Sequence, residues 1–107
     1  MDNKELLLKK LSENYHINLK NVVYKEIDFK KNVVDIYKLM SVSFICEEDL
    51  EKNLYVVETK TGFFDMAFCY LAFKIENEKI YIVAYGKEGL IKQNICEKAI
   101  NKIINNI

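Results

Sequence analysis

The chain has 107 residues, half of them hydrophobic and 30% charged, a balance that is typical of one folded domain and excludes a disordered chain. Sixteen basic residues offset sixteen acidic ones, and every basic residue is a lysine. Arginine is the side chain that usually reads phosphates and guanine edges, so its absence predicts no nucleic-acid partner. We treat residues 1–107 as a single domain.

The amino-terminal residues give no sign of a targeting segment. Asp2 to Glu5 are polar and precede a short leucine cluster, without the basic stretch, long apolar core or cleavage site of a signal peptide. The most apolar run of the chain is also too short to span a membrane. We therefore expect a cytoplasmic protein that does not associate with membranes.

The first elements are a helix and a strand. Asp2 and Glu5 have the spacing of a capping box, and apolar residues then recur at helical intervals as far as Tyr15, which predicts a helix over about residues 3–14. A cluster of β-branched and aromatic residues between Asn21 and Phe29 predicts a first strand.

The segment 33–46 fits two structures. Its apolar residues recur at helical spacing, as at Ile36 and Met40, but they also alternate with serines near the end of the segment. Enrichment in β-branched and aromatic residues favours a strand, and a helix is the alternative. Residues 47–53 then form an acidic connector in this interpretation, and residues 54–59 form the next strand.

The most informative stretch is residues 63–73, which read Phe-Phe-Asp-Met-Ala-Phe-Cys-Tyr-Leu-Ala-Phe. Asp65 is its only charge, and we place that carboxylate at the exposed end of the strand or at the polar point of a binding site. A strand that faced water on one side would alternate apolar with polar residues. This stretch therefore predicts a central strand that is covered on both faces.

The two faces of this strand differ in size. Alternation places Phe64, Phe68 and Tyr70 on one face, and the smaller Ala67 and Cys69 on the other. Small residues allow a helix to approach closely, so we expect the carboxyl-terminal helix over Ala67 and Cys69. The aromatic face is then the expected binding surface.

A hairpin and a helix complete the chain. Residues 76–78 separate two β-rich stretches and predict a turn, and Gly86 ends the last strand. From Ile95 onward, apolar residues fill about half of a helical wheel. The whole pattern predicts an α+β fold with an N-terminal helix, about five antiparallel strands in meander order, and a long C-terminal amphipathic helix packed on one sheet face.

Candidate catalytic groups are few. His16 is the one histidine and lies in a polar connector, and no cysteine stands at a spacing typical of a Cys/His couple. Cys46, Cys69 and Cys96 are odd in number and widely spaced, which favours reduced thiols over a disulfide framework. An enzyme that uses Cys46 or His16 is the weakest hypothesis, and we predict no catalytic residue.

Metal and cofactor motifs are also missing from the sequence. The acidic residues 47–51 lack the glycine of a calcium loop, and residues 59–62 lack the paired glycines of a phosphate-binding loop. We predict no metal site and no cofactor.

The leading hypothesis is a small non-enzymatic protein-interaction module, which binds a protein partner or forms a homodimer through a sheet face or edge. The alternative is a small domain that holds an apolar or aromatic ligand in a pocket between sheet and helix. The candidate binding residues are Phe64, Asp65, Phe68, Tyr70, Tyr81 and Tyr85.

Overall fold

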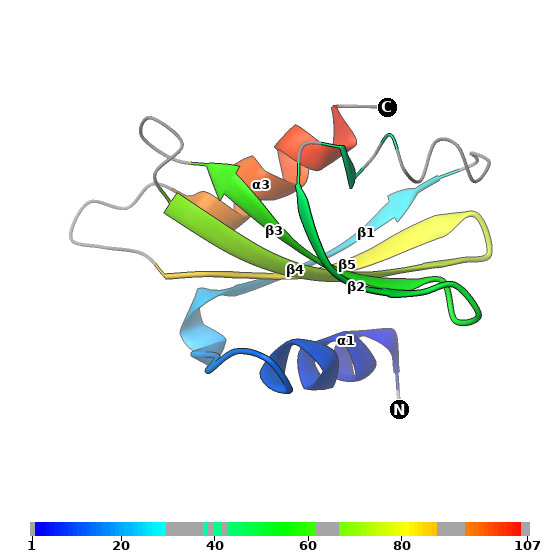
Figure 1. The fold of residues 1–107 in the computed structure, drawn as a ribbon, viewed down its shortest axis with the longest axis horizontal. Helices are drawn as coiled ribbons and strands as arrows, with labels where there is room; N and C mark the ends of the chain where they lie inside the picture. Colours follow the sequence, from blue (N-terminus) through cyan, green and yellow to red (C-terminus); the bar gives the residue numbers. More distant parts are fainter. Residues whose placement is uncertain are drawn as a thin grey trace.

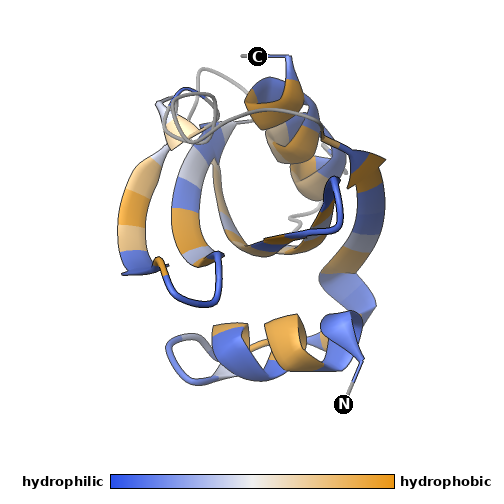
Figure 2. Cartoon of the chain, turned by 90° about the vertical axis from the view of Figure 1, so that its right-hand side faces the viewer, coloured by the Kyte–Doolittle hydropathy of each residue, from blue (hydrophilic) through white to orange (hydrophobic). Residues whose placement is uncertain are grey.

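The structure is a computed structural model that describes residues 2–29, 38, 40–41, 43–61, 67–87 and 94–105. It is an α+β fold in which a five-stranded antiparallel sheet lies between two helices (Figures 1 and 2). The elements are α1 (Asn3–Ser12), a 3-10 helix (Leu19–Asn21), β1 (Val22–Asp28), β2 (Phe44–Asp49), β3 (Leu54–Thr61), β4 (Ala67–Glu76), β5 (Lys79–Gly86) and α3 (Ile95–Ile104). None of the helices in these described ranges is both long and apolar enough to cross a membrane.

The sheet has the strand order β1-β5-β4-β3-β2, and every neighbouring pair is antiparallel. The prediction of five antiparallel strands is confirmed, and β2 to β5 do follow one another as a meander. The meander prediction is wrong for β1, which lies beside β5 at the opposite edge from β2. Local sequence patterns identify strands, but the pairing of β1 with β5 is a contact between distant segments that no local pattern encodes.

The first helix begins where its capping residue predicts. The Asp2 carboxylate accepts a hydrogen bond of 2.8 Å from the backbone N–H of Glu5, which satisfies one of the amides at the helix start. Leu7 and Leu11 are buried against the sheet, one helical turn apart. α1 therefore covers one face of the sheet.

The central strand is β4, as predicted, and its two faces pack against different helices. The odd-numbered Cys69, Leu71 and Phe73 belong to the core on the α3 side, whereas Ala72 belongs to the core on the α1 side. The predicted placement of the carboxyl-terminal helix over Ala67 and Cys69 agrees with this core, against which Ala67 also packs. Residues 62–66, which begin the aromatic run, lie outside the described residues.

The closing helix α3 has ten residues and is shorter than the long helix that the sequence predicts. It buries Ile95, Cys96, Ala99, Ile100 and Ile103. The first residue of the helix packs closely against the end of β5. A Cβ atom added to Gly86 would lie only 2.6 Å from Cγ2 of Ile95. Gly86 is thus required by close packing between strand and helix.

The ambiguous segment differs from its prediction. Residues 33–37, 39 and 42 lie outside the described part of the chain, but Lys38 and Met40 have helical backbone, so the strand prediction is wrong there and right at Phe44–Cys46. The predicted acidic connector is also wrong at its start, because β2 continues through Asp49. β2 lies at an edge of the sheet, where charged side chains reach water without leaving the strand.

The turn between β4 and β5 confirms the predicted hairpin. Asn77 and Glu78 are its two central residues, with φ angles of 53° and 60°. Positive φ at both positions is the geometry of a type I′ turn, whose twist matches that of the flanking strands. Asparagine adopts this conformation readily, whereas glutamate does so at a cost.

Candidate functional site

The sequence-predicted binding residues do not form one exposed surface. Phe64 and Asp65 lie outside the described residues. Tyr85 is buried in the core beneath α1, and Tyr70 and Tyr81 are half-buried against that core. Phe68 is the exception, with 46% of its surface exposed.

Tyr70 is covered from within the chain by Tyr15, which follows the end of α1. The two rings are stacked with centroids 4.0 Å apart and planes 22° apart, and Tyr70 stacks in turn beside Tyr85 at 6.5 Å. The expectation that the aromatic face of β4 is left open is therefore wrong as far as Tyr70. The sequence gives no signal for this contact, because the two rings come from segments far apart in the chain.

The Tyr15 hydroxyl lies between two acceptors, the Glu58 carboxylate at 3.1 Å and the Cys46 sulfur at 3.4 Å. Burial, more than either neighbour, raises the pKa of Tyr15 well above its ordinary value of 10.0. The phenol therefore stays protonated and acts as a donor that ties α1 to β2 and β3. It cannot serve as a base that activates the Cys46 thiol.

The two candidate catalytic groups also lie in different places. Cys46 lines a hollow with Tyr15 and Glu47, whereas His16 lines a separate hollow with Leu8 and Leu19. A nucleophile and its base must lie within hydrogen-bond reach of each other. Nothing in the described residues brings these two groups together.

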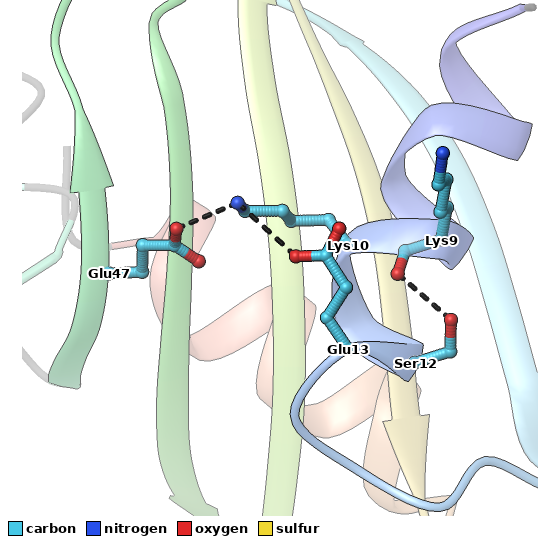
Figure 3. Close-up of polar contacts among 5 residues, drawn as sticks. All are labelled: Lys9, Lys10, Ser12, Glu13 and Glu47. Carbon is cyan, nitrogen blue, oxygen red and sulfur yellow. Dashed lines mark hydrogen bonds and ion pairs between the residues drawn. The ribbon is translucent and has the colours of Figure 1, made fainter.

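An ion pair joins α1 to the edge strand β2. The ammonium of Lys10 lies 2.7 Å from a Glu47 carboxylate oxygen and 3.5 Å from a Glu13 carboxylate oxygen. Figure 3 shows both contacts. The hydrogen bond to Glu47 is the largest cause of a raised pKa for Lys10. Such partly exposed pairs contribute about 1 kcal/mol or less, so this bridge orients β2 more than it stabilises the fold.

Three of the five large apolar side chains that are exposed among the described residues lie on β2 or directly after it. Phe44 is 74% exposed and Ile45 41% exposed, and Leu50, directly after the strand, is 60% exposed. Phe44 pairs with Glu58 and Ile45 with Val57, so the two side chains point to opposite faces of the sheet. No sequence pattern marks these residues as a binding surface, because the segment that leads into β2 fits both a helix and a strand.

A hollow of about 360 Å³ lies where β2 begins, beside the end of β3. It is lined by Ser41, Ser43, Phe44, Glu58, Lys60, Phe68 and Lys102. The Lys60 ammonium lies 5.8 Å from the centre of the Phe68 ring, and the Lys102 ammonium donates a hydrogen bond of 2.9 Å to the Lys60 carbonyl. The hollow thus brings together residues of β2, β3, β4 and α3, which the sequence spaces too widely to suggest a site.

Among the described residues, no group of three or more histidine, cysteine or acidic side chains is placed to hold a metal ion. No family model matches the chain, and neither a curated protein nor a solved structure matches it.

Proposed function

We propose that this chain is a non-enzymatic interaction module that binds an extended segment of a partner protein along the edge strand β2. The observation that carries the proposal is the exposure of Phe44 and Ile45 on opposite faces of this edge. Within the described part of the chain, β2 has a strand neighbour on one side only. An added strand would gain backbone hydrogen bonds and side-chain contacts on both faces.

The other edge of the sheet is less suited to this role. The apolar side chains of β1 are all half-buried, and its exposed residues are the acidic Glu26 and Asp28. Burial of one large apolar side chain contributes about 1.5–3 kcal/mol, so the exposed Phe44 and Ile45 give β2 the greater capacity to hold a partner.

The charge of β2 favours a basic partner over a second copy of the chain. Glu47, Glu48 and Asp49 follow one another in the strand, and Glu47 pairs with Lys10. In a centred antiparallel pair of two β2 strands, Glu48 and Asp49 of one copy would lie opposite Ile45 and Phe44 of the other, so carboxylates would meet apolar side chains and no cation. A partner strand with lysine or arginine beside apolar residues would instead complement this edge.

The irregularity of β2 restricts which strands can bind. The register of β2 against β3 shifts between Ile45 and Glu47, with Cys46 as the extra residue. Bulges and charges are devices that protect sheet edges from indiscriminate pairing. The partner strand must therefore be short and complementary in charge.

The test uses a synthetic peptide of alternating lysine and valine, with a proline-containing peptide of the same length and charge as its control. In a nuclear magnetic resonance titration we expect saturable shifts of the Phe44–Asp49 amides with the first peptide only, and weaker binding at higher salt. Ile45→Lys should abolish the shifts. The matched control Leu19→Lys, at another apolar residue that is 72% exposed, should not.

Two results would contradict the proposal. One is that the peptide leaves the β2 amides unchanged, or that Leu19→Lys weakens binding as much as Ile45→Lys does. The other is a dimer in light scattering at micromolar concentration that Ile45→Lys converts to a monomer, because the edge would then belong to a second copy of the chain.

A further inference from the structure

We infer that Cys96 and Cys69 form a redox-active thiol pair, which a low-molecular-weight disulfide oxidises to an internal disulfide between α3 and β4. Cys96 is the thiol that attacks the small disulfide, and Cys69 is the thiol that closes the internal bond. The inference goes beyond strand binding, because it concerns a reaction on the α3 side of the sheet and uses no residue of β2.

The two cysteines lie together under the start of α3. Both side chains belong to the core on the α3 side, and both carry reduced thiols. Cys69 lies directly opposite Gly86 in the pairing of β4 with β5, and the Cys96 sulfur is 3.6 Å from the position of a Cβ atom added to Gly86. Side chains of directly opposite residues in an antiparallel pair point to the same face. The Cys96 sulfur therefore occupies the space that Gly86 leaves beside Cys69.

Cys69 has the environment of the thiol that reacts second. Its hydrogen bond with the Cys96 thiol is the largest cause of a raised pKa for Cys69, and burial is the next. Cys69 has none of its surface exposed, so a reagent from solvent does not reach it directly. Once the Cys96 sulfur is bonded in a mixed disulfide, the contribution of the Cys96 thiol to this raised pKa ends. Cys69 is then easier to ionise, beside the sulfur that it attacks.

Cys96 is placed to react first. It is the second residue of α3, where the partial positive charge of a helix start stabilises a thiolate, and the side chain of Asn94 does not cap this helix. Cys96 also lines a hollow of about 200 Å³ between the start of β1 and the start of α3. Its sulfur lies 3.4 Å from the carbonyl oxygen of Asn21, another residue of that lining. A small disulfide that enters the hollow therefore meets Cys96 before Cys69.

The reaction is thiol–disulfide exchange in two steps. In the first step the Cys96 sulfur attacks one sulfur of the small disulfide, the bond between its two sulfurs breaks, and one small thiol leaves with the Cys96 proton. In the second step the Cys69 sulfur attacks the Cys96 sulfur of the mixed disulfide, and the other small thiol leaves with the Cys69 proton. The cysteine pair loses two electrons, and the small disulfide is reduced to two thiols.

The test treats the folded protein with 2-hydroxyethyl disulfide, a small neutral disulfide, in a Cys46→Ser background. Cys46 is exposed, and the substitution removes its own mixed disulfide from the measurement. We expect the loss of both remaining thiols, a decrease in protein mass by two hydrogen atoms, and a Cys69–Cys96 link in the peptide map. Dithiothreitol should restore both thiols.

Two alanine variants in the same background separate the two thiols. Cys69→Ala should stop the reaction at a mixed disulfide on Cys96, because the closing thiol is missing. Cys96→Ala should leave Cys69 unreacted, because Cys69 is buried. The matched control keeps Cys46 and replaces both other cysteines by alanine, and it should gain one adduct on Cys46 and form no internal link.

The inference is overturned if both thiols of the folded Cys46→Ser protein survive the treatment, or if the first adduct forms on Cys69. It is equally overturned if folded Cys69→Ala gains no adduct on Cys96. A thermal melt establishes that each variant is folded, and the peptide map of the Cys46→Ser protein decides the question even if an alanine variant is not. Strand binding is measured separately at the β2 amides, so failure of one proposal leaves the other standing.

Discussion

Tyr15 lies flat on Tyr70, with ring centroids 4.0 Å apart, and its hydroxyl reaches Glu58 on the neighbouring strand. One side chain at the end of α1 therefore contacts β4 through its ring and β3 through its oxygen. This contact covers Tyr70 on the aromatic face of β4, whereas Phe68, two residues earlier on the same face, stays exposed.

The two functions of Tyr15 can be separated by substitution. Tyr15→Phe keeps the stacked ring and loses the hydrogen bond, so we expect the free energy of unfolding to fall by about 1 kcal/mol. Tyr15→Ala also loses the stacking, which contributes about 0.5–1.5 kcal/mol beyond the lost buried area, so it should be clearly less stable than Tyr15→Phe. Urea denaturation measures both, and equal stability of the two variants would contradict the role of the ring.

Gly86 should tolerate no side chain. Gly86→Ala places a methyl group against Ile95, and overpacking of this kind costs about 1–3 kcal/mol of unfolding free energy. Part of that loss should be recovered in a double variant with Ile95→Ala, because the smaller side chain removes the clash. If the two substitutions are strictly additive in a double-mutant cycle, Gly86 and Ile95 are not in contact.

Glu78 is the strained position of the β4–β5 hairpin. Glu78→Gly converts the turn into the Asn-Gly pair that type I′ geometry favours, and we expect a gain of about 0.5–1 kcal/mol in unfolding free energy. Glu76→Gly, two residues earlier and inside β4, is the control and should lose about the same amount, since glycine weakens a strand. In thermal and urea denaturation, Glu78→Gly should be more stable than the wild type and Glu76→Gly less stable.

Alkaline conditions should destabilise the fold. Burial, followed by the hydrogen bond from its hydroxyl to Glu26, raises the pKa of Tyr24 from 10.0 to about 12. The unfolded chain ionises this phenol near its ordinary value, so the stabilisation is complete below about pH 10 and is lost as the pH rises towards 12. The raised pKa of Tyr15 and of Tyr55, which burial also causes, acts in the same direction.

The measurement is unfolding free energy as a function of pH, with Tyr24→Phe as the matched variant. The wild type should lose stability more steeply between pH 10 and 12 than Tyr24→Phe does. Phenolate absorbance should show that part of the tyrosine titrates later in the native state than in denaturant. Parallel stability curves for the two proteins would count against a raised pKa at Tyr24.

Local sequence patterns predicted an element correctly where the residues of that element alone determine its structure. The cap at Asp2, the hairpin at residues 76–78 and the two unequal faces of β4 follow from spacing and side-chain size, and the structure agrees with each of them. The edge position of β1 does not follow, because it depends on a pairing with β5 across the chain.

The proposed binding surface was harder to predict for the same physical reason. Phe44 and Ile45 are exposed on an edge strand, and the edge position of β2 depends on which strands pair. Tyr70 looked like a recognition residue, yet Tyr15 covers it. Which aromatic residue stays exposed is decided by where α1 ends on the sheet, and helix ends are the least predictable part of an element.

The position of β1 has a consequence for how the chain folds. α1 and β1 are made first on the ribosome, but β1 has no strand to pair with until β5, the last strand, has been made. The β2–β5 meander joins neighbours in sequence, whereas β1 and β5 must close a separation of about fifty to sixty residues, which is the slower step. We therefore expect the apolar side chains of β1 to stay uncovered until β5 has been made.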